Sequence, residues 1–217
     1  MKPPVFDPDC RACPRLSQFL DQVRREYPDY HAAPVAPFGV ERPRLLLVGL
    51  APGMHGANAS GRPFTGDHAG ILLYRTLHQY GFASAAESIG QDDGLQLIDC
   101  RITNAVKCLP PQNKPSGEEI RRCNAFLAAE LAGLADGSLV LALGAIAHQA
   151  VLRGLGLRPA QYKFGHAAEH QLGRLRLIDS YHCSRYNTQT GRLSAPMFAA
   201  VFARAQEILA QSADPGH

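Results

Sequence analysis

The sequence predicts an α/β fold built around a parallel sheet. Short apolar runs, which are typical of buried strands, alternate along the chain with segments of helical periodicity, and such alternation favours parallel strands joined by helices. The 217 residues, 46% hydrophobic and 19% charged, are enough to bury one sizeable core, and no linker-like stretch divides them. We therefore expect a single domain over residues 1–217.

Four apolar runs are the predicted strands. In the first, residues 44–49, a Leu-Leu-Leu-Val run is stopped by glycine and proline, which indicates a buried strand that enters a loop. The other three are residues 99–106, 138–143 and 175–180.

Four segments have the periodicity of helices. One of them, residues 118–134, follows Ser116 and Glu119, which have the spacing of a capping box. The last, from about residue 196 to 211, places most of its apolar side chains on one face and is expected to pack on the sheet. The remaining two are residues 71–80 and 145–153.

Three segments that carry polar side chains lie at the ends of predicted strands or directly after them. They are residues 49–67, 104–108 and 182–192. In a parallel α/β sheet, ligands bind outside the carboxyl ends of the strands, because the loops converge there. The sequence therefore predicts one functional site at this edge of the sheet.

Four of the six cysteines have the spacing of metal ligands. Cys10 and Cys13 form a Cys-x-x-Cys pair, and Cys108 and Cys123 follow in mid-chain. Four thiolates would tie the N-terminus to the chain after the second strand, and both zinc and an iron-sulfur cluster fit this spacing. The alternative is an isolated redox pair together with buried thiols. Cys100, inside an apolar strand, is expected to be a core residue, and Cys183 is a weak candidate for a reactive thiol.

A reducing compartment favours metal binding over disulfides. The N-terminal residues lack the apolar core of a secretion signal, and no apolar run is long enough to cross a bilayer. We therefore expect a cytoplasmic protein that makes no membrane contact, in which clustered cysteines bind metal. The net charge is +3, and 18 of the 22 basic residues are arginine, which permits nucleic-acid binding without demanding it.

The first loop lacks the signature of a phosphate-binding Walker loop, since Gly49 to Gly53 is followed by neither lysine nor a hydroxyl residue at the required spacing. The same loop continues to Phe64, which is able to stack on a flat ligand or to join the core. Asp67 precedes a predicted helix, so it is a candidate both for chemistry and for capping that helix.

The two other loops begin with side chains suited to recognition. Asn104 stands at a strand end, where its amide can donate and accept hydrogen bonds at once, as recognition of a base edge requires. A plain loop hydrogen bond is the alternative. His182 follows the last strand and is either a structural residue or a donor to developing negative charge. For His148, among others, the sequence identifies no partner.

With these residues assembled, the chain resembles the uracil-DNA glycosylase superfamily, and specifically its B-type (family five) iron-sulfur members. The resemblance spans nearly the whole chain. It is carried by the Cys10/Cys13 pair and by four stretches, residues 49–58, 61–67, 104–108 and 182–188.

The resemblance implies a three-layer fold, with a central four-stranded parallel sheet between helices, and an enzyme of DNA repair. The implied reaction is hydrolysis of the N-glycosidic bond of uracil in DNA, extending to hypoxanthine, xanthine and ethenocytosine. The implied cofactor is a structural [4Fe-4S] cluster. Its ligands would be Cys10, Cys13, Cys108 and Cys123.

The resemblance also assigns roles to residues of the three loops. Those implied in catalysis are Asp67, Asn104 and His182. Those implied in holding the substrate are Gly49, Ala51, Phe64, Asn104 and His182. Those implied in DNA contact are Asn58, Arg185, Asn187 and Arg192, with Tyr186 or Leu193 as a wedge that fills the vacated base stack.

The chain departs at two positions from the pattern of the family that it resembles. Sister A-type enzymes carry a glutamate where this chain has Leu50, so Asp67 is the nearest carboxylate left for the chemistry. Cys183 replaces a frequent proline, which changes the stiffness of the loop but not the expected role of His182.

We expect a monomer that acts on duplex or single-stranded DNA. We also expect that it does not cleave the DNA strand, because cleavage through a Schiff base needs an amine and Lys107 is the only lysine in the three loops. Two other classes of protein fit part of the pattern. One is a non-enzymatic module, stapled by metal, that binds damaged or single-stranded DNA. The other is an electron-transfer protein that uses the cluster.

Overall fold

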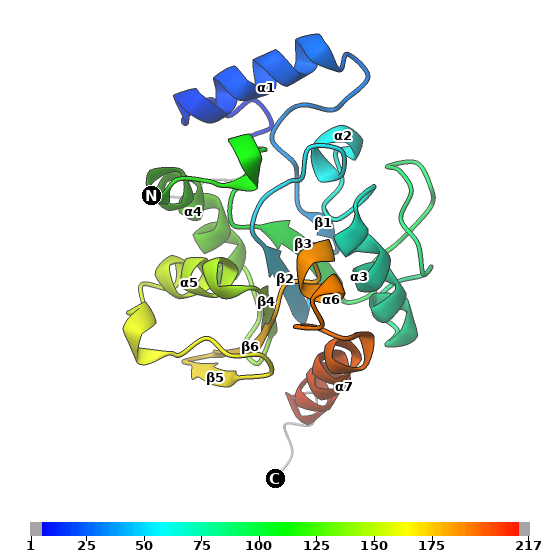
Figure 1. The fold of residues 1–217 in the computed structure, drawn as a ribbon. Helices are drawn as coiled ribbons and strands as arrows, with labels where there is room; N and C mark the ends of the chain where they lie inside the picture. The colour runs from blue at the N-terminus through cyan, green and yellow to red at the C-terminus, as the bar shows by residue number, and fades with distance from the viewer. Residues whose placement is uncertain (1–5, 213–217) are drawn as a thin grey trace.

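A mixed six-stranded sheet forms the centre of the computed structural model, which describes residues 6–212 (Figure 1). The strand order is β1-β3-β2-β4-β6-β5, and the four central strands are parallel. These are β3 (Cys100–Asn104), β2 (Leu45–Gly49), β4 (Leu139–Leu143) and β6 (Leu175–Ser180). The short edge strands β1 (Phe38–Gly39) and β5 (Glu169–Leu172) are antiparallel to their neighbours.

Helices cover both faces of the sheet, which gives three layers (Figure 1). Residues of α1, α4 and α5 share one hydrophobic core with one face, and residues of α3 and α7 share a second core with the other. The side chains of β2 alternate between the two cores, as expected of a strand buried on both faces. The helices are α1 (Pro14–Glu26), α2 (Ala57–Ser60), α3 (His68–Gln79), α4 (Gly117–Ala132), α5 (Ala145–Gly154), α6 (Arg185–Gln189) and α7 (Ala195–Ser212).

The α/β fold class and all four predicted parallel strands are confirmed. The four predicted helices are present as α3, α4, α5 and α7. The capping box is also confirmed, because the Ser116 hydroxyl accepts from the Glu119 backbone N–H at 3.2 Å and the Glu119 carboxylate accepts from the Ser116 N–H at 2.7 Å. The expected sheet of four strands is extended by the two antiparallel edges, β1 and β5, which are too short to give a periodic signal.

The sequence analysis also missed α1, which begins directly after the first cysteine pair. Proline at its first position and three apolar residues at helical spacing, Leu16, Leu20 and Val23, are the signals for it. These side chains are buried against the core that contains Cys108 and Cys123.

Among residues 6–212, no helix is both long and apolar enough to span a membrane.

Candidate active site

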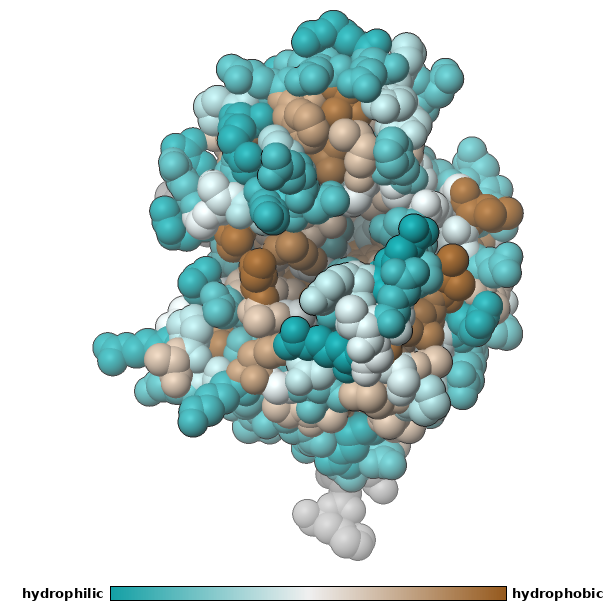
Figure 2. Space-filling view, viewed as in Figure 1, coloured by the Kyte–Doolittle hydropathy of each residue, from teal (hydrophilic) through white to brown (hydrophobic). Residues whose placement is uncertain are grey.

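The carboxyl ends of the central strands surround a cavity of about 510 Å³. Gly49 and Asn104 are paired at the ends of β2 and β3, and His182 follows β6. Figure 2 shows this face of the molecule hollowed above α6. The cavity is lined by the four side chains from which the sequence analysis predicted a site: Phe64, Asp67, Asn104 and His182.

Phe64 and His182 form one wall of the cavity from opposite loops. Their rings are stacked, with centroids 5.9 Å apart and an angle of 28° between the planes. Phe64 is only 6% exposed and has a positive φ of 56°, so a tight turn presents its ring. The turn is anchored from behind, because the Tyr74 hydroxyl donates to the Pro63 carbonyl at 2.8 Å. The Arg62 guanidinium also forms a buried ion pair with Asp93 at 2.8 Å.

Gly49 does not line the cavity but lies behind two residues that do. A Cβ on Gly49 would stand 2.4 Å from Asn104 Oδ1 and 2.7 Å from Phe64 Cζ, closer than any carbon atom can pack. Glycine is therefore required here so that both side chains can take their positions. Ala51, two residues later, does line the cavity.

Asn104 presents an unpaired amide oxygen. Its Oδ1 is buried and has no hydrogen-bond partner among residues 6–212. A buried acceptor without a partner costs about 1–3 kcal/mol. A ligand N–H that reached this oxygen would satisfy it.

The two carboxylate oxygens of Asp67 have different surroundings. Oδ1 accepts from the Gly70 backbone N–H at 2.9 Å and so caps α3, as predicted. Oδ2 makes no hydrogen bond within the described chain, and a Cβ on Gly56 would stand 2.7 Å from it. The glycine leaves room for the carboxylate to face the cavity, so capping and chemistry are compatible at this residue.

A hydrogen bond holds the backbone of His182, and the residue lines the cavity. Asn187 Nδ2 donates to the His182 carbonyl at 2.8 Å. Burial lowers the pKa of the imidazole, whereas the nearby Asp67 carboxylate opposes that shift. The net lowering keeps the ring neutral at pH 7, a form that can donate a hydrogen bond to an anionic group.

The DNA-contact residues predicted after β6 lie on and beyond α6, a short helix where a loop was expected. Arg185 is exposed and lines the cavity, and the exposed Arg192 guanidinium lies 4.6 Å from the centre of the Tyr181 ring. Asn187 instead supports His182. Of the two wedge candidates, Tyr186 is 71% exposed, whereas Leu193 is fully buried and is excluded in this conformation.

Asn58, for which we predicted a DNA contact, has a buried side chain in this conformation, and its contact with DNA stays a prediction. Asn58 is 0% exposed, because residues 57–60 form the short helix α2 and turn its side chain inward. Neither atom of its amide has a hydrogen-bond partner within residues 6–212.

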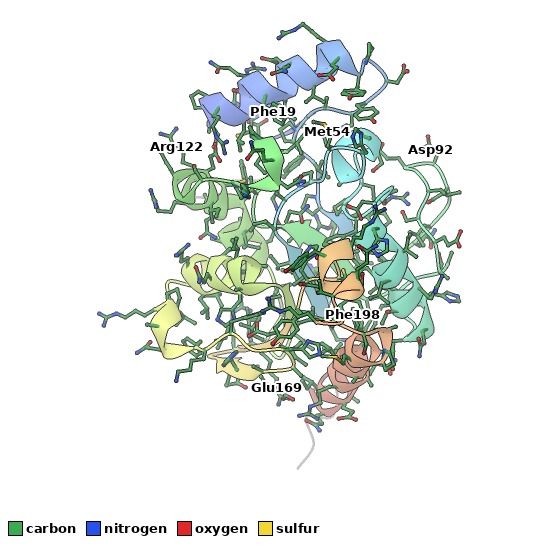
Figure 3. All side chains as sticks on the ribbon, in the orientation of Figure 1. Phe19, Met54, Asp92, Arg122, Glu169 and Phe198 are labelled. Atoms are coloured by element: carbon green, nitrogen blue, oxygen red, sulfur yellow. The ribbon has the colours of Figure 1, made fainter. Side chains whose placement is uncertain are left out.

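Three other cavity residues were assigned no role in the sequence analysis. Met54 lies between α1 and α2 (Figure 3) and lines the cavity together with His55 and Asn113. His55 Nδ1 is 2.8 Å from the Tyr30 hydroxyl, which links the loop to the segment after α1. Asn113 has a positive φ of 57° in η1 (Pro111–Asn113), a conformation that asparagine tolerates well. These positions depend on tertiary contacts that no local pattern encodes.

The four predicted metal ligands meet at a second place. Cys10, Cys13, Cys108 and Cys123 line one small pocket between α1 and α4. The backbone N–H of Lys107 donates to Cys123 Sγ at 3.2 Å. Burial, reinforced by the other cysteines, raises the pKa of Cys108 to about 12, and burial raises that of Cys123 to about 11. Such thiols ionise at neutral pH only when a cation compensates their charge, so this donor set suits a metal centre.

The remaining cysteines belong to the core. Cys100 and Cys183 are both 0% exposed. Burial raises the pKa of each thiol, which leaves Cys183 protonated and without the properties of a nucleophile. Lys107 is also buried, and its ammonium forms an ion pair with Glu130 at 2.6 Å.

The chain matches known DNA glycosylases over most of its length. Residues 36–206 match the family model of the uracil DNA glycosylase superfamily. The chain is 45% identical over 205 residues to the type-5 uracil-DNA glycosylase of Thermus thermophilus, which covers 92% of this chain and 93% of that protein. It is 41% identical over 208 residues to that of Mycobacterium tuberculosis, covering 92% and 78% of the two chains. The type-4 uracil-DNA glycosylase of Thermotoga maritima is 35% identical over 105 residues, 48% of this chain and 46% of that one.

Proposed function

The chain belongs to the uracil-DNA glycosylase superfamily, and we propose that it is a uracil-DNA glycosylase of DNA repair. It hydrolyses the N-glycosidic bond of uracil and leaves an abasic site. The observation that carries this proposal is that Phe64, Asp67, Asn104 and His182 line a single cavity at the carboxyl edge of the sheet.

Recognition begins when the nucleotide rotates out of the duplex. This step costs a few kcal/mol, and less for a mispaired base such as uracil opposite guanine. The extruded base stacks on Phe64, and the unpaired Oδ1 of Asn104 accepts from the N–H of its Watson-Crick edge. Selection thus precedes the chemical step.

Cleavage then needs stabilisation of opposite charges on the sugar and on the base. The electron pair of the C1′–N bond leaves with the base, and C1′ gains oxocarbenium character. The neutral His182 ring donates a hydrogen bond to the departing base. The Oδ2 atom of Asp67 positions a water molecule, which adds its hydroxyl to C1′, and the carboxylate accepts the released proton.

The segment after β6 is the proposed DNA-contact surface. Arg185 and Arg192 are exposed and supply positive charge for phosphates, and Tyr186 is the proposed wedge. Asn187 contributes indirectly, through the backbone of His182.

The proposed cofactor is a [4Fe-4S] cluster held by Cys10, Cys13, Cys108 and Cys123. A tetrahedral zinc ion with Zn–S bonds of about 2.3 Å would bring its sulfurs within about 3.8 Å of one another. Within residues 6–212, no three of these sulfurs lie within 4.8 Å of one another. The wider spacing favours a cluster, in which each thiolate binds a different iron. The cluster would connect α1 to α4, alongside the ion pair of Arg15 and Glu119 at 2.7 Å.

The proposal includes substrates beyond uracil and excludes strand cleavage. A cavity of about 510 Å³ lies in the range that holds ligands larger than a pyrimidine, which leaves room for hypoxanthine, xanthine or ethenocytosine. Strand cleavage through a Schiff base needs a free amine, and the Lys107 amine is buried in its ion pair with Glu130.

The test is release of free base from defined duplexes. Purified, cluster-containing protein is incubated with duplexes that hold one uracil, hypoxanthine, xanthine or ethenocytosine, and half of each sample is treated with alkali before gel separation. We expect free uracil and strand breaks only after alkali. Binding without base release would indicate a non-enzymatic module instead. Breaks without alkali, or a borohydride-trapped adduct, would contradict the monofunctional mechanism.

A further inference from the structure

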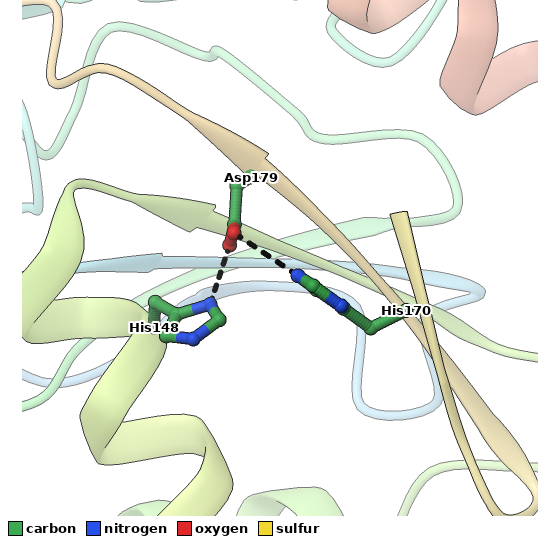
Figure 4. Close-up of side chains that lie close together, drawn as sticks. All are labelled: His148, His170 and Asp179. Atoms are coloured by element: carbon green, nitrogen blue, oxygen red, sulfur yellow. Dashed lines mark hydrogen bonds and ion pairs between the residues drawn. The ribbon is translucent and has the colours of Figure 1, made fainter. Parts of the chain in front are cut away.

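Three titratable side chains that take no part in the proposed chemistry meet inside the molecule (Figure 4). They are His148 on α5, His170 on β5 and Asp179 on β6. Their ligand atoms all lie within 4.8 Å of one another, and within residues 6–212 no other three His, Cys, Asp or Glu side chains are so arranged. None of them lines the active-site cavity.

The carboxylate of Asp179 stands between the two imidazoles. His148 Nδ1 is 2.8 Å from Asp179 Oδ1, and His170 Nε2 is 3.4 Å from Asp179 Oδ2. His148 and Asp179 are almost completely buried, and the side chain of His170 is 15% exposed. Three polar groups are thus withdrawn from water together.

The surroundings orient His148 as metal-binding proteins orient a ligand. Its Nε2–H donates to the backbone carbonyl of Tyr162 at 3.0 Å, because a carbonyl can only accept. Metal-bound histidines typically donate their other ring N–H to a carbonyl or carboxylate in this way. A second proton lies between His148 Nδ1 and Asp179 Oδ1, which are 2.8 Å apart, and an ion that displaced this proton would meet the lone pair of Nδ1. The backbone N–H of Gly165 donates to Asp179 Oδ2 at 3.4 Å and holds the carboxylate.

One atom of the group lacks a hydrogen bond. His170 Nε2 is buried and makes no hydrogen bond within the described residues, although it faces Asp179. An unsatisfied buried polar atom costs about 1–3 kcal/mol. An ion placed between the three side chains would satisfy it, and would replace the proton that His148 and Asp179 otherwise share.

We propose that His148 Nδ1, His170 Nε2 and the Asp179 carboxylate bind one divalent transition-metal ion of the zinc type. Two imidazoles and one carboxylate are a donor set that suits zinc, whereas magnesium and calcium prefer oxygen ligands alone. The site is separate from the four cysteines, which offer only sulfur. It does not depend on the proposed glycosylase activity.

The ion would connect the helix α5 to the strands β5 and β6, which lie at one edge of the sheet. β5 is a short antiparallel edge strand, and β6 leads from Asp179 to His182 three residues later. A metal bond between α5, β5 and β6 would therefore stabilise the strand that delivers His182 to the cavity. We expect the ion to act through the fold and not to contact the substrate.

The test is zinc binding by the cluster-containing protein after treatment with a mild chelator. Titration calorimetry with zinc chloride is carried out on the wild type, on His170→Gln, and on His78→Gln, a matched loss of an exposed histidine on α3. We expect one equivalent of zinc in the wild type and in His78→Gln. Loss of even an outer-shell partner weakens metal binding about 10–100-fold, so loss of the ligand His170 should weaken it by about 100-fold or more.

Two controls make the result decisive. Visible absorbance of the cluster shows whether zinc has displaced iron at the cysteines, and melting temperature with and without zinc shows whether His170→Gln is folded. Equal zinc binding by the wild type and His170→Gln would overturn the proposal. In crystals grown with zinc, the absence of an anomalous peak between the three side chains at the zinc edge would also overturn the proposal. A peak at that position would support the proposal even if the variant failed to fold.

Discussion

The rings of Phe64 and His182 stack on each other in one wall of the active-site cavity, with their centroids 5.9 Å apart. Phe64 stands in the turn that follows β2, and His182 follows β6, with β4 between these two strands in the sheet. The wall that would hold a flat base therefore depends on the strand order, because the loop after β2 and the loop after β6 each supply one of its two rings.

The protonation of His182 depends on the burial of its ring. Its pKa is lowered from 6.5, chiefly by burial, while Asp67 opposes the shift. The folded protein then binds fewer protons than the unfolded chain just below pH 6.5, so this residue reduces stability as the pH falls through that range. NMR titration should place the midpoint below 6.5, and lower still in Asp67→Asn. A midpoint at or above 6.5 in the wild type would contradict the description of a buried neutral ring.

Gly49→Ala should impair catalysis by displacement. The new methyl group would force Asn104 and Phe64 to move, and a displacement of about 1 Å in an active site costs about 10²-fold in rate. We expect a single-turnover rate of uracil release lower by about that factor, measured by rapid quench. Gly90→Ala is the matched control, because a Cβ there meets nothing within 4 Å. Equal rates for Gly49→Ala and the wild type would show that the glycine is not needed for this geometry.

Cys10→Ser should affect the fold more than the chemistry. Cys10 belongs to the thiol group between α1 and α4, and none of the four cysteines lines the cavity. We expect loss of bound iron and a lower melting temperature, with the rate per folded molecule changed only a few-fold. Cys100→Ala, a core cysteine outside the group, should retain its iron. A colourless Cys10→Ser protein with wild-type stability would refute the structural role.

Tyr186→Ala should distinguish duplex from single-stranded substrate. The exposed ring is proposed to occupy the space that the extruded base leaves, and this helps only where a stack exists. We expect release from duplex DNA to slow about tenfold, equivalent to about 1.4 kcal/mol, with little change on a single strand. An equal loss on both substrates would point to a role other than filling the stack.

The central sheet and the four cavity side chains could be predicted because their signals are local. The run after Arg44 and the capping box at Ser116 and Glu119 depend on neighbours in the sequence. The convergence of Phe64, Asp67 and His182 then follows from the geometry of parallel strands.

The sequence was least informative where tertiary contacts determine the position of a side chain. Asn58 stands in a loop-like sequence of small residues, yet the chain turns it inward in α2. Leu193 follows an exposed arginine but packs into the core. His148 gave no hint of a partner, since Asp179 approaches it from β6 and His170 joins them through the antiparallel pairing of β5 with β6.

Asp67→Asn provides the most direct test that this cavity carries out the chemistry. Asparagine caps a helix about as well as aspartate, so α3 and the melting temperature should be preserved while the proton acceptor is lost. General acid-base groups contribute about 10²–10⁴-fold, so we expect release of uracil under single-turnover conditions to fall by about 10²-fold or more, with DNA binding retained. Asp92→Asn, at an exposed position, is the control. A wild-type rate in Asp67→Asn would contradict the assignment of the chemical step to this site.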